Sequence, residues 1–183
     1  AIYGDSEMIK TIHLAGGDPL SKDTNGNTPL SLVLHKGESD IKAVLGTNLN
    51  LCDSDGNTPV HVAVLSKINP QTMKMILDMN YPVNRRNSSG TTPLTLAISQ
   101  NSIQLAALLL EYGADPYISD NKGECAVSLA LKGNTPVLDY IVKHSAIKTD
   151  ISGEGILHYA ARLSDVETVI KLVSMWLKKN QKS

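Results

Sequence analysis

Apolar residues recur along the chain at helical rather than strand spacing. In the clearest segment, Leu105, Leu108 and Leu109 fall at positions i, i+3 and i+4 and therefore share one face of a helix. Gly113 follows this segment and is expected to end the helix. Elsewhere, Thr-Pro pairs precede short apolar runs. Thr is a favoured N-cap and Pro is tolerated in the first helical turn, so each pair predicts the start of a helix.

These helix starts belong to a segment that recurs five times. A glycine precedes each start, at positions 26, 56, 90, 123 and 153, so the spacings are 30, 34, 33 and 30 residues. Asp and Gly ahead of the Thr-Pro pair predict a tight turn in which the glycine has a positive φ. The strongest copies read Gly26-Asn27-Thr28-Pro29-Leu30, Gly56-Asn57-Thr58-Pro59-Val60 and Gly90-Thr91-Thr92-Pro93-Leu94.

A period near 33 residues with a Thr-Pro-Leu-His-x-Ala core resembles the ankyrin repeat. The resemblance covers the whole chain and implies an all-α solenoid of stacked helix-turn-helix units with projecting β-hairpin or loop tips. We expect one domain, 1–183, in which 1–22 is a partial repeat that lacks its first half and 150–183 is a C-terminal cap. The expected repeats are 1–22, 23–52, 53–86, 87–119, 120–149 and 150–183.

The composition fits thin apolar layers between neighbouring repeats. The chain is 42% hydrophobic but only 4% aromatic and has no Phe, so a core must be built from Leu, Ile, Val and Ala. A small residue recurs in the first helix of four of the five repeats and lets helices approach closely; these residues are Ala63, Ala97, Ala130 and Ala160. The formal net charge of −1 argues against a dedicated nucleic-acid binder. No apolar run approaches the roughly 18 residues of a membrane span.

Catalytic, cofactor-binding and metal-binding motifs are absent from the sequence. It has no phosphate-binding Gly-rich loop, no His-Glu-x-x-His and no Gly-x-Ser-x-Gly. Ser39 and Lys42 match Ser-x-x-Lys, but without its companion motifs we interpret them as helix surface. His61 and His158 occupy the His position of the repeat core, where the resemblance implies a structural role. They stand about three repeats apart, so they are not expected to share a metal.

Cys52 and Cys125 lie more than two repeat steps apart, too far for a disulfide. We expect two free, buried thiols, which favour a reducing intracellular compartment, including one reached as a secreted effector. A metal or redox site is a weaker alternative, because no Cys-x-x-Cys or nearby His supports it.

The resemblance implies that partners bind the concave face, at the loop tips and at the exposed ends of the inner helices. Among these candidates, Arg85, Arg86 and Lys122 are expected to form a basic spot, and Leu65, Ile151 and Leu163 are apolar positions expected to face outward. At the tips the candidates are Thr24, Asn25, Asn27, Ser54, Asp55, Asn57, Arg86, Ser88, Ser89, Thr91, Asn121, Lys122, Glu124, Ile151, Ser152 and Glu154. At the helix ends they are His35, Lys36, Leu65, Ser66, Ser99, Gln100, Lys132, Arg162 and Leu163.

The sequence therefore favours a non-catalytic, monomeric protein-interaction module that binds a protein or peptide. A second hypothesis is an ankyrin segment of a larger enzyme, channel or secreted effector whose active part lies outside this chain. An intrinsic enzyme would need a cleft with convergent titratable groups, and a nucleic-acid binder would show steep salt dependence.

Overall fold

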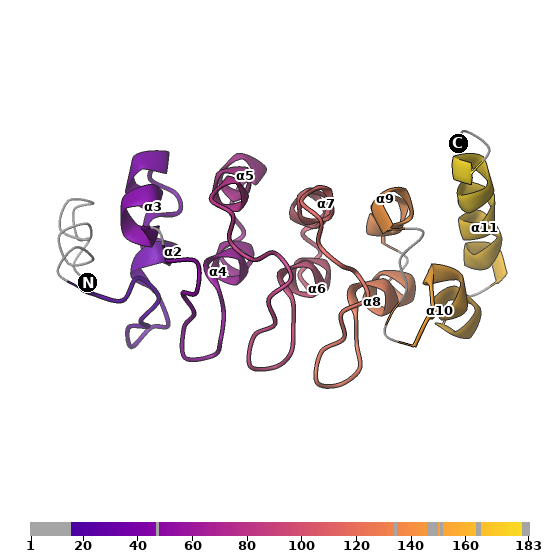
Figure 1. Ribbon diagram of the computed structural model, residues 1–183, viewed down its shortest axis with the longest axis horizontal. Coiled ribbons are helices and arrows are strands. Elements are labelled where there is room, and N and C mark those ends of the chain that lie inside the picture. Colours follow the sequence, from indigo (N-terminus) through magenta and orange to yellow (C-terminus); the bar gives the residue numbers. More distant parts are fainter. Residues whose placement is uncertain are drawn as a thin grey trace.

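Two rows of helices make up the protein. The computed structural model describes residues 16–46, 48–133, 135–145, 150, 152–163 and 166–180, which contain ten α-helices and no β-strand. The inner row is α2 (Pro29–Val33), α4 (Pro59–Leu65), α6 (Pro93–Ser99), α8 (Ala126–Lys132) and α10 (Ile156–Leu163). The outer row is α3 (Glu38–Leu45), α5 (Pro70–Asp78), α7 (Ile103–Glu111), α9 (Val137–Ser145) and α11 (Val166–Asn180). The all-α solenoid expected from the sequence is confirmed (Figure 1).

The inner helices begin where the sequence predicted. Thr28 and Thr92 accept hydrogen bonds from the backbone N–H groups of Ser31 and Thr95 at 3.0 and 3.2 Å. A proline occupies the first turn of α2, α4 and α6, where its missing N–H costs little. In the degenerate fourth copy Cys125 takes the place of Thr, and its Sγ accepts from the Ser128 N–H at 3.5 Å. The capping arrangement thus survives the loss of the Thr-Pro pair.

A tip loop precedes each inner helix, and the loops before α2, α4, α6 and α8 project from the solenoid (Figure 1). Tip loops 1 to 4 are residues 23–27, 53–57, 87–91 and 120–124, and tip loop 5 is 150–154, of which residue 151 lies outside the described part. The first residue of each loop accepts two backbone N–H groups of its own loop through Oδ1. In tip loop 2, Asp53 accepts from Asp55 at 2.9 Å and from Asn57 at 2.7 Å. The loop glycines have φ between 75° and 81°, as the turn chemistry predicted.

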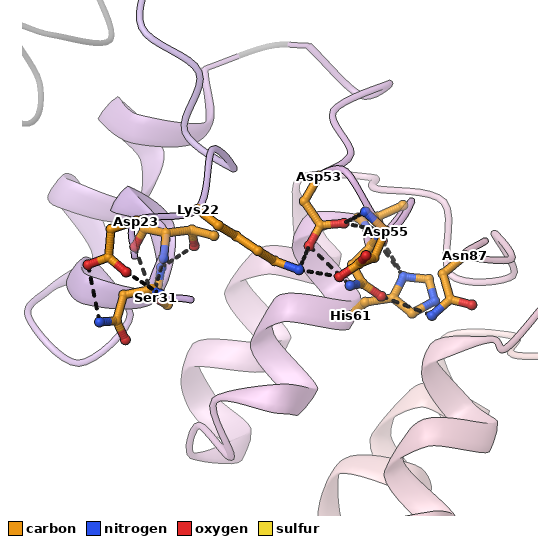
Figure 2. Close-up of polar contacts among 11 residues, drawn as sticks. Lys22, Asp23, Ser31, Asp53, Asp55, His61 and Asn87 are labelled. Atoms are coloured by element: carbon orange, nitrogen blue, oxygen red, sulfur yellow. Dashed lines mark hydrogen bonds and ion pairs between the residues drawn. The ribbon is translucent and has the colours of Figure 1, made fainter. Parts of the chain in front are cut away.

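Neighbouring tip loops are joined by direct hydrogen bonds. The Ser88 N–H donates to the Asp55 carbonyl at 2.9 Å, and the Asn121 N–H donates to the Ser89 carbonyl at 3.1 Å. Asn87 Nδ2 also donates to Asn57 Oδ1 at 2.9 Å (Figure 2). Tip loops 2, 3 and 4 therefore form one continuous hydrogen-bonded array.

The core between the rows is mainly aliphatic. Buried residues such as Leu30, Ala63, Leu94 and Leu109 recur from repeat to repeat, as expected for a chain without Phe. Tyrosines supply the aromatic part of this core: Tyr81, Tyr117 and Tyr159 are buried in it. Tyr81 donates its hydroxyl proton to the Leu45 carbonyl at 3.3 Å, and burial raises its pKa to about 12.

His61 joins two repeats from inside α4. Its side chain is fully buried, its Nδ1 accepts from the Thr58 N–H at 3.2 Å, and its Nε2 lies 3.0 Å from the Thr91 carbonyl. Because Nδ1 accepts, the proton of the neutral ring lies on Nε2, which donates to Thr91. The geometry confirms the structural role expected for this residue. His158, its counterpart in α10, accepts from the Gly155 N–H at 3.2 Å but is exposed.

The stacking of the tip loops predicts different costs for the same substitution at two glycines. Gly26 and Gly90 both have φ near 80°, so Ala at either position is expected to cost about 1–2 kcal/mol from backbone strain. A Cβ at position 90 would also lie 2.7 Å from the Asn121 backbone nitrogen, whereas one at position 26 meets no atom within 4 Å. Chemical denaturation should show Gly90→Ala to be the more destabilising by a further ~1–3 kcal/mol. Equal losses would contradict the close loop contact.

The burial of His61 predicts a specific pH dependence of stability. Burial lowers the pKa of His61 below its ordinary 6.5, against the opposing effect of the Thr91 hydrogen bond. Below pH 6.5 the unfolded chain therefore binds more protons at this position than the folded chain. As the pH is lowered from 6.5, the free energy of unfolding falls until the pH passes the pKa of the folded state.

The variant His61→Thr tests this dependence, because Thr95 occupies the same position in α6 and forms its cap without an imidazole. It should cost about 0.5–1.5 kcal/mol at neutral pH by removing the hydrogen bond from His61 Nε2 to the Thr91 carbonyl, which keeps its bond from the Asn87 N–H. Denaturation curves on both sides of pH 6.5 should show a smaller loss of stability on acidification than in the wild type. An unchanged pH slope would contradict the burial argument.

Candidate interaction surface

Two rows of exposed side chains follow the inner helices. The tip row stands one residue before each loop glycine and comprises Asn25, Asp55, Ser89, Lys122 and Ser152. The helix-end row stands at or just beyond the last turn of each inner helix and comprises His35, Leu65, Ser99, Lys132 and Arg162. All ten side chains are exposed, and each row repeats one structural position in five successive units. The sequence reasoning assigned all ten of these residues to the partner-binding face.

Ion pairs connect the two sides of this surface in the last two units. Lys132 Nζ lies 2.5 Å from Glu124 Oε1, and Arg162 Nη1 lies 2.9 Å from Glu154 Oε2. The hydrogen bond from Lys132 holds the pKa of the Glu124 carboxyl below its ordinary value. The Arg162 guanidinium also lies 5.1 Å from the centroid of the Tyr159 ring, in cation–π contact. Lys132 and Arg162 are therefore already paired within their own units.

Several candidates at the loop tips have structural roles instead. Asn57 is buried: its Nδ2 donates to Asp53 Oδ2 at 3.0 Å and its Oδ1 accepts from Asn87. Asn121 accepts from Arg86 Nη2 at 2.9 Å and donates to the Ser88 carbonyl at 3.0 Å. The Asn57 side chain is thus buried and joins two tip loops, whereas the sequence placed it at an exposed tip. The exposed residues Asn25, Ser54, Ser88, Ser89 and Lys122 remain candidates.

Arg85 and Arg86 do not act as one basic spot. Arg85 Nη1 donates to Asn50 Oδ1 at 3.3 Å, back toward the preceding repeat. Arg86 Nε donates to the Gly90 carbonyl at 3.1 Å, and its Nη2 reaches Asn121 in tip loop 4. The two guanidinium groups thus bind opposite neighbours, and that of Arg86 joins tip loop 3 to tip loop 4.

The apolar candidates divide in the same way. Leu65 is 45% exposed at the end of α4, as expected, whereas Leu163 is half-buried against the core. Ile151 lies outside the described residues. Ser66, Gln100 and Thr91 are half-buried, while Lys36 is exposed. The sequence predicted that Leu163 faces outward, but its side chain packs against the core.

Leu32 in α2 is an exposed apolar residue that the sequence reasoning missed. Leu30 and Leu34 stand four residues apart and are both buried, so they mark the core face of this short helix. Leu32, halfway between them, lies about 200° around the helix and must point away from that face. Helical periodicity within this segment could therefore have found it.

Lys22 forms a charge cluster with tip loop 2 that the sequence also did not reveal (Figure 2). Its Nζ lies 3.0 Å from Asp53 Oδ2 and forms a second ion pair with Asp55. Burial alone would raise the pKa of the Asp53 carboxyl, but hydrogen bonds from Asn57 and the ion pair with Lys22 outweigh it and lower that pKa. The hydrogen bond to Asp55 and then that to Asp53 raise the pKa of Lys22. Through side chains alone, this cluster connects the residue that precedes tip loop 1 to tip loop 2.

The described residues offer no arrangement typical of catalysis. A cavity of 460 Å³ near tip loops 3 to 5 is lined by Asp115, Asp120, Asp150 and Arg86 among others. Its Asp150 carboxylate already accepts from the Tyr159 hydroxyl at 2.7 Å and from two loop N–H groups. Within the described ranges, no three His, Cys, Asp or Glu side chains could together hold a metal ion.

The two cysteines are free, but their surroundings differ. Cys125 is buried as the cap of α8, whereas Cys52 is exposed. The expectation of two buried thiols is therefore wrong for Cys52, which stands in the segment that leads into tip loop 2 rather than in a helix.

Among the described helices, none is both long enough and apolar enough to cross a membrane.

Comparison with known proteins supports the repeat assignment. The family model described as ankyrin repeats in three copies matches residues 1–87 and 40–120. A putative ankyrin repeat protein of Acanthamoeba polyphaga mimivirus is 33% identical over 108 residues, which are 56% of this chain and 66% of that protein. The phosphocholine transferase AnkX of Legionella pneumophila is 31% identical over 150 residues, which are 76% of this chain and 16% of that enzyme. The chain thus spans less than two thirds of the length of these relatives.

Solved structures show the same fold. The crystal structure of the ankyrin repeat domain of Bcl-3 superposes with a TM-score of 0.69 over 92% of this chain and 77% of that domain, at 23% sequence identity. That likeness concerns the arrangement of helices and loops. Together with the family match, it shows that this chain belongs to the ankyrin repeat family.

Proposed function

We propose that this chain is a non-catalytic interaction module that binds a protein or peptide across the tip row and the helix-end row. Ankyrin repeats are a general protein-interaction module, which supports a protein partner. Exposed positions that repeat at the same place in successive units provide an extended surface for such a partner. Because tip loops 2 to 4 are joined by backbone hydrogen bonds, this part of the surface is formed before the partner binds, which lowers the entropic cost of association.

The observation that carries this proposal is the uneven pairing of the helix-end row. Lys132 and Arg162 are satisfied by Glu124 and Glu154, and the Ser99 hydroxyl donates to the Leu96 carbonyl at 2.8 Å, whereas Leu65 presents an apolar side chain to solvent. We therefore place the main contact on the second and third units, around Leu65 and the exposed Ser88 and Ser89 of tip loop 3. The expected partner offers an apolar side chain to Leu65 and hydrogen-bonding groups to the serine hydroxyls.

A second candidate function is that of an ankyrin segment within a larger effector or enzyme. It is favoured by the match to the Legionella phosphocholine transferase, of which the aligned part is only 16%. In that case the same surface would hold a target protein for an activity carried by another part of the molecule. The location of the contact surface would be the same for both functions.

A charge introduced at Leu65 tests the proposed surface. Leu65→Asp should abolish or strongly weaken partner capture, because it places an unpaired carboxylate in the apolar part of the contact. The partner is first captured on the wild-type chain and fixed by chemical cross-linking so that it can be identified. Its dissociation constant is then measured for the wild type and for each variant. Gln104→Asp is the matched control, because it adds the same charge at an exposed position of α7 in the outer row.

Thermal unfolding should be the same for both variants, since both positions are exposed. If the Leu65 variant bound the partner with wild-type affinity, the proposed surface would be rejected. Arg86 is a poorer probe, because its reversal would also break the hydrogen bonds between tip loops 3 and 4.

A further inference from the structure

The outer side of α11 carries a continuous apolar row. Val166, Ile170, Val173 and Leu177 are 75%, 63%, 36% and 48% exposed and follow one another at spacings of four, three and four residues. That spacing places them on one helical face, called here the outer stripe. Isolated exposed apolar residues are ordinary on protein surfaces, but four on one face mark a candidate contact.

The outer stripe occupies the register of a stacking face. Residues of α11 correspond to residues of α7 that precede them by 63 positions, the separation of Gly153 from Gly90. Burial supports this register, because Leu105 and its counterpart Thr168 are both buried, as are Leu109 and Leu172.

The counterparts of the outer stripe in and just after α7 are covered. Ala107, Leu110 and Ala114 are buried, and Ile103 is half-buried, on a helix that packs against α9. The outer stripe therefore presents the surface with which one repeat normally packs on the next. No element of the described part covers it.

Charges beside the outer stripe indicate which occupant fits. Glu167 and Lys178 are both exposed and lie on the same flank of the stripe, at opposite ends of it. When two such helices pack antiparallel, Val166 of one copy faces Leu177 of the other and Ile170 faces Val173. The same alignment brings Glu167 of each copy close to Lys178 of the other copy. The surface is therefore complementary to itself in both apolar and charged positions.

We propose that a second copy of this chain docks on the outer stripe, with the two α11 helices antiparallel across a two-fold axis. The contact lies on the last outer helix, away from the tip row and helix-end row, so it leaves the proposed partner surface open (Figure 1). A single helix pair is a small interface, so the association is weak and depends on concentration. This dimer would replace the monomer expected from the sequence.

Sedimentation equilibrium over a concentration series tests the dimer. The wild-type chain should shift from monomer to dimer as its concentration rises. Ile170→Lys should raise the dissociation constant by roughly tenfold or more, because it buries an unpaired charge at the centre of the contact. Leu49→Lys is the matched control: it changes an exposed leucine outside α11 and outside both rows, and it should keep the wild-type dissociation constant.

Circular dichroism should show the same helix content for all three proteins. A wild type that stays monomeric at every concentration would overturn the proposal, as would an Ile170 variant that dimerises normally. A chain that stays monomeric but binds a different amphipathic helix on the outer stripe would also overturn it.

A charge exchange tests the antiparallel arrangement separately. Glu167→Lys and Lys178→Glu should each dimerise less than the wild type, since each brings like charges together at both ends of the contact. An equimolar mixture of the two variants restores opposite charges at both ends, so it should associate more tightly than either variant alone. A mixture no tighter than the single variants would rule out the antiparallel pairing.

Discussion

Each repeat of this protein depends on one side-chain oxygen, the Oδ1 of the residue that opens its tip loop. Asp23, Asp53, Asn87, Asp120 and Asp150 all use this atom to accept two backbone N–H groups of their own loop. The closed loop places the following cap at the start of the inner helix. In tip loops 2 to 4 it also orients the loop backbone so that remaining donors and acceptors meet those of the neighbouring loop. A local turn thereby becomes the connection between units.

The chain's local chemistry was sufficient to predict this framework. Thr-Pro pairs marked the starts of α2, α4 and α6, and glycine spacing identified the turns, because both depend on residues close together in sequence. Contacts between repeats were not predictable in the same way. Asn57 and Arg86 look like surface residues in sequence, but their partners in the next repeat lie 30 or more residues away. Lys22 reaches tip loop 2 across a similar separation.

The interaction surface shows the same division. Equivalent positions along the two rows follow directly from the repeat, so their exposure could be predicted. Which of them remain available to a partner depends on pairing inside each unit, as with Lys132 and Glu124. The repeat thus determines where a partner can bind, and the differences between units determine which part of the surface is used.

The close approach at two glycines has a mechanical consequence. Gly56 and Gly90 are packed against the next loop, with room for no side chain, whereas Gly26 and Gly123 face open space. Tip loops 2 to 4 should therefore move together as one rigid unit. Tip loop 1 should be more flexible, because the described residues connect it to tip loop 2 only through the ion pairs of Lys22. Bending of the solenoid would then concentrate between tip loops 1 and 2 and between tip loops 4 and 5. The affinity of a partner that contacts both sides of such a bend would depend on the curvature of the solenoid, whereas the affinity of a partner bound only to tip loops 2 to 4 would not.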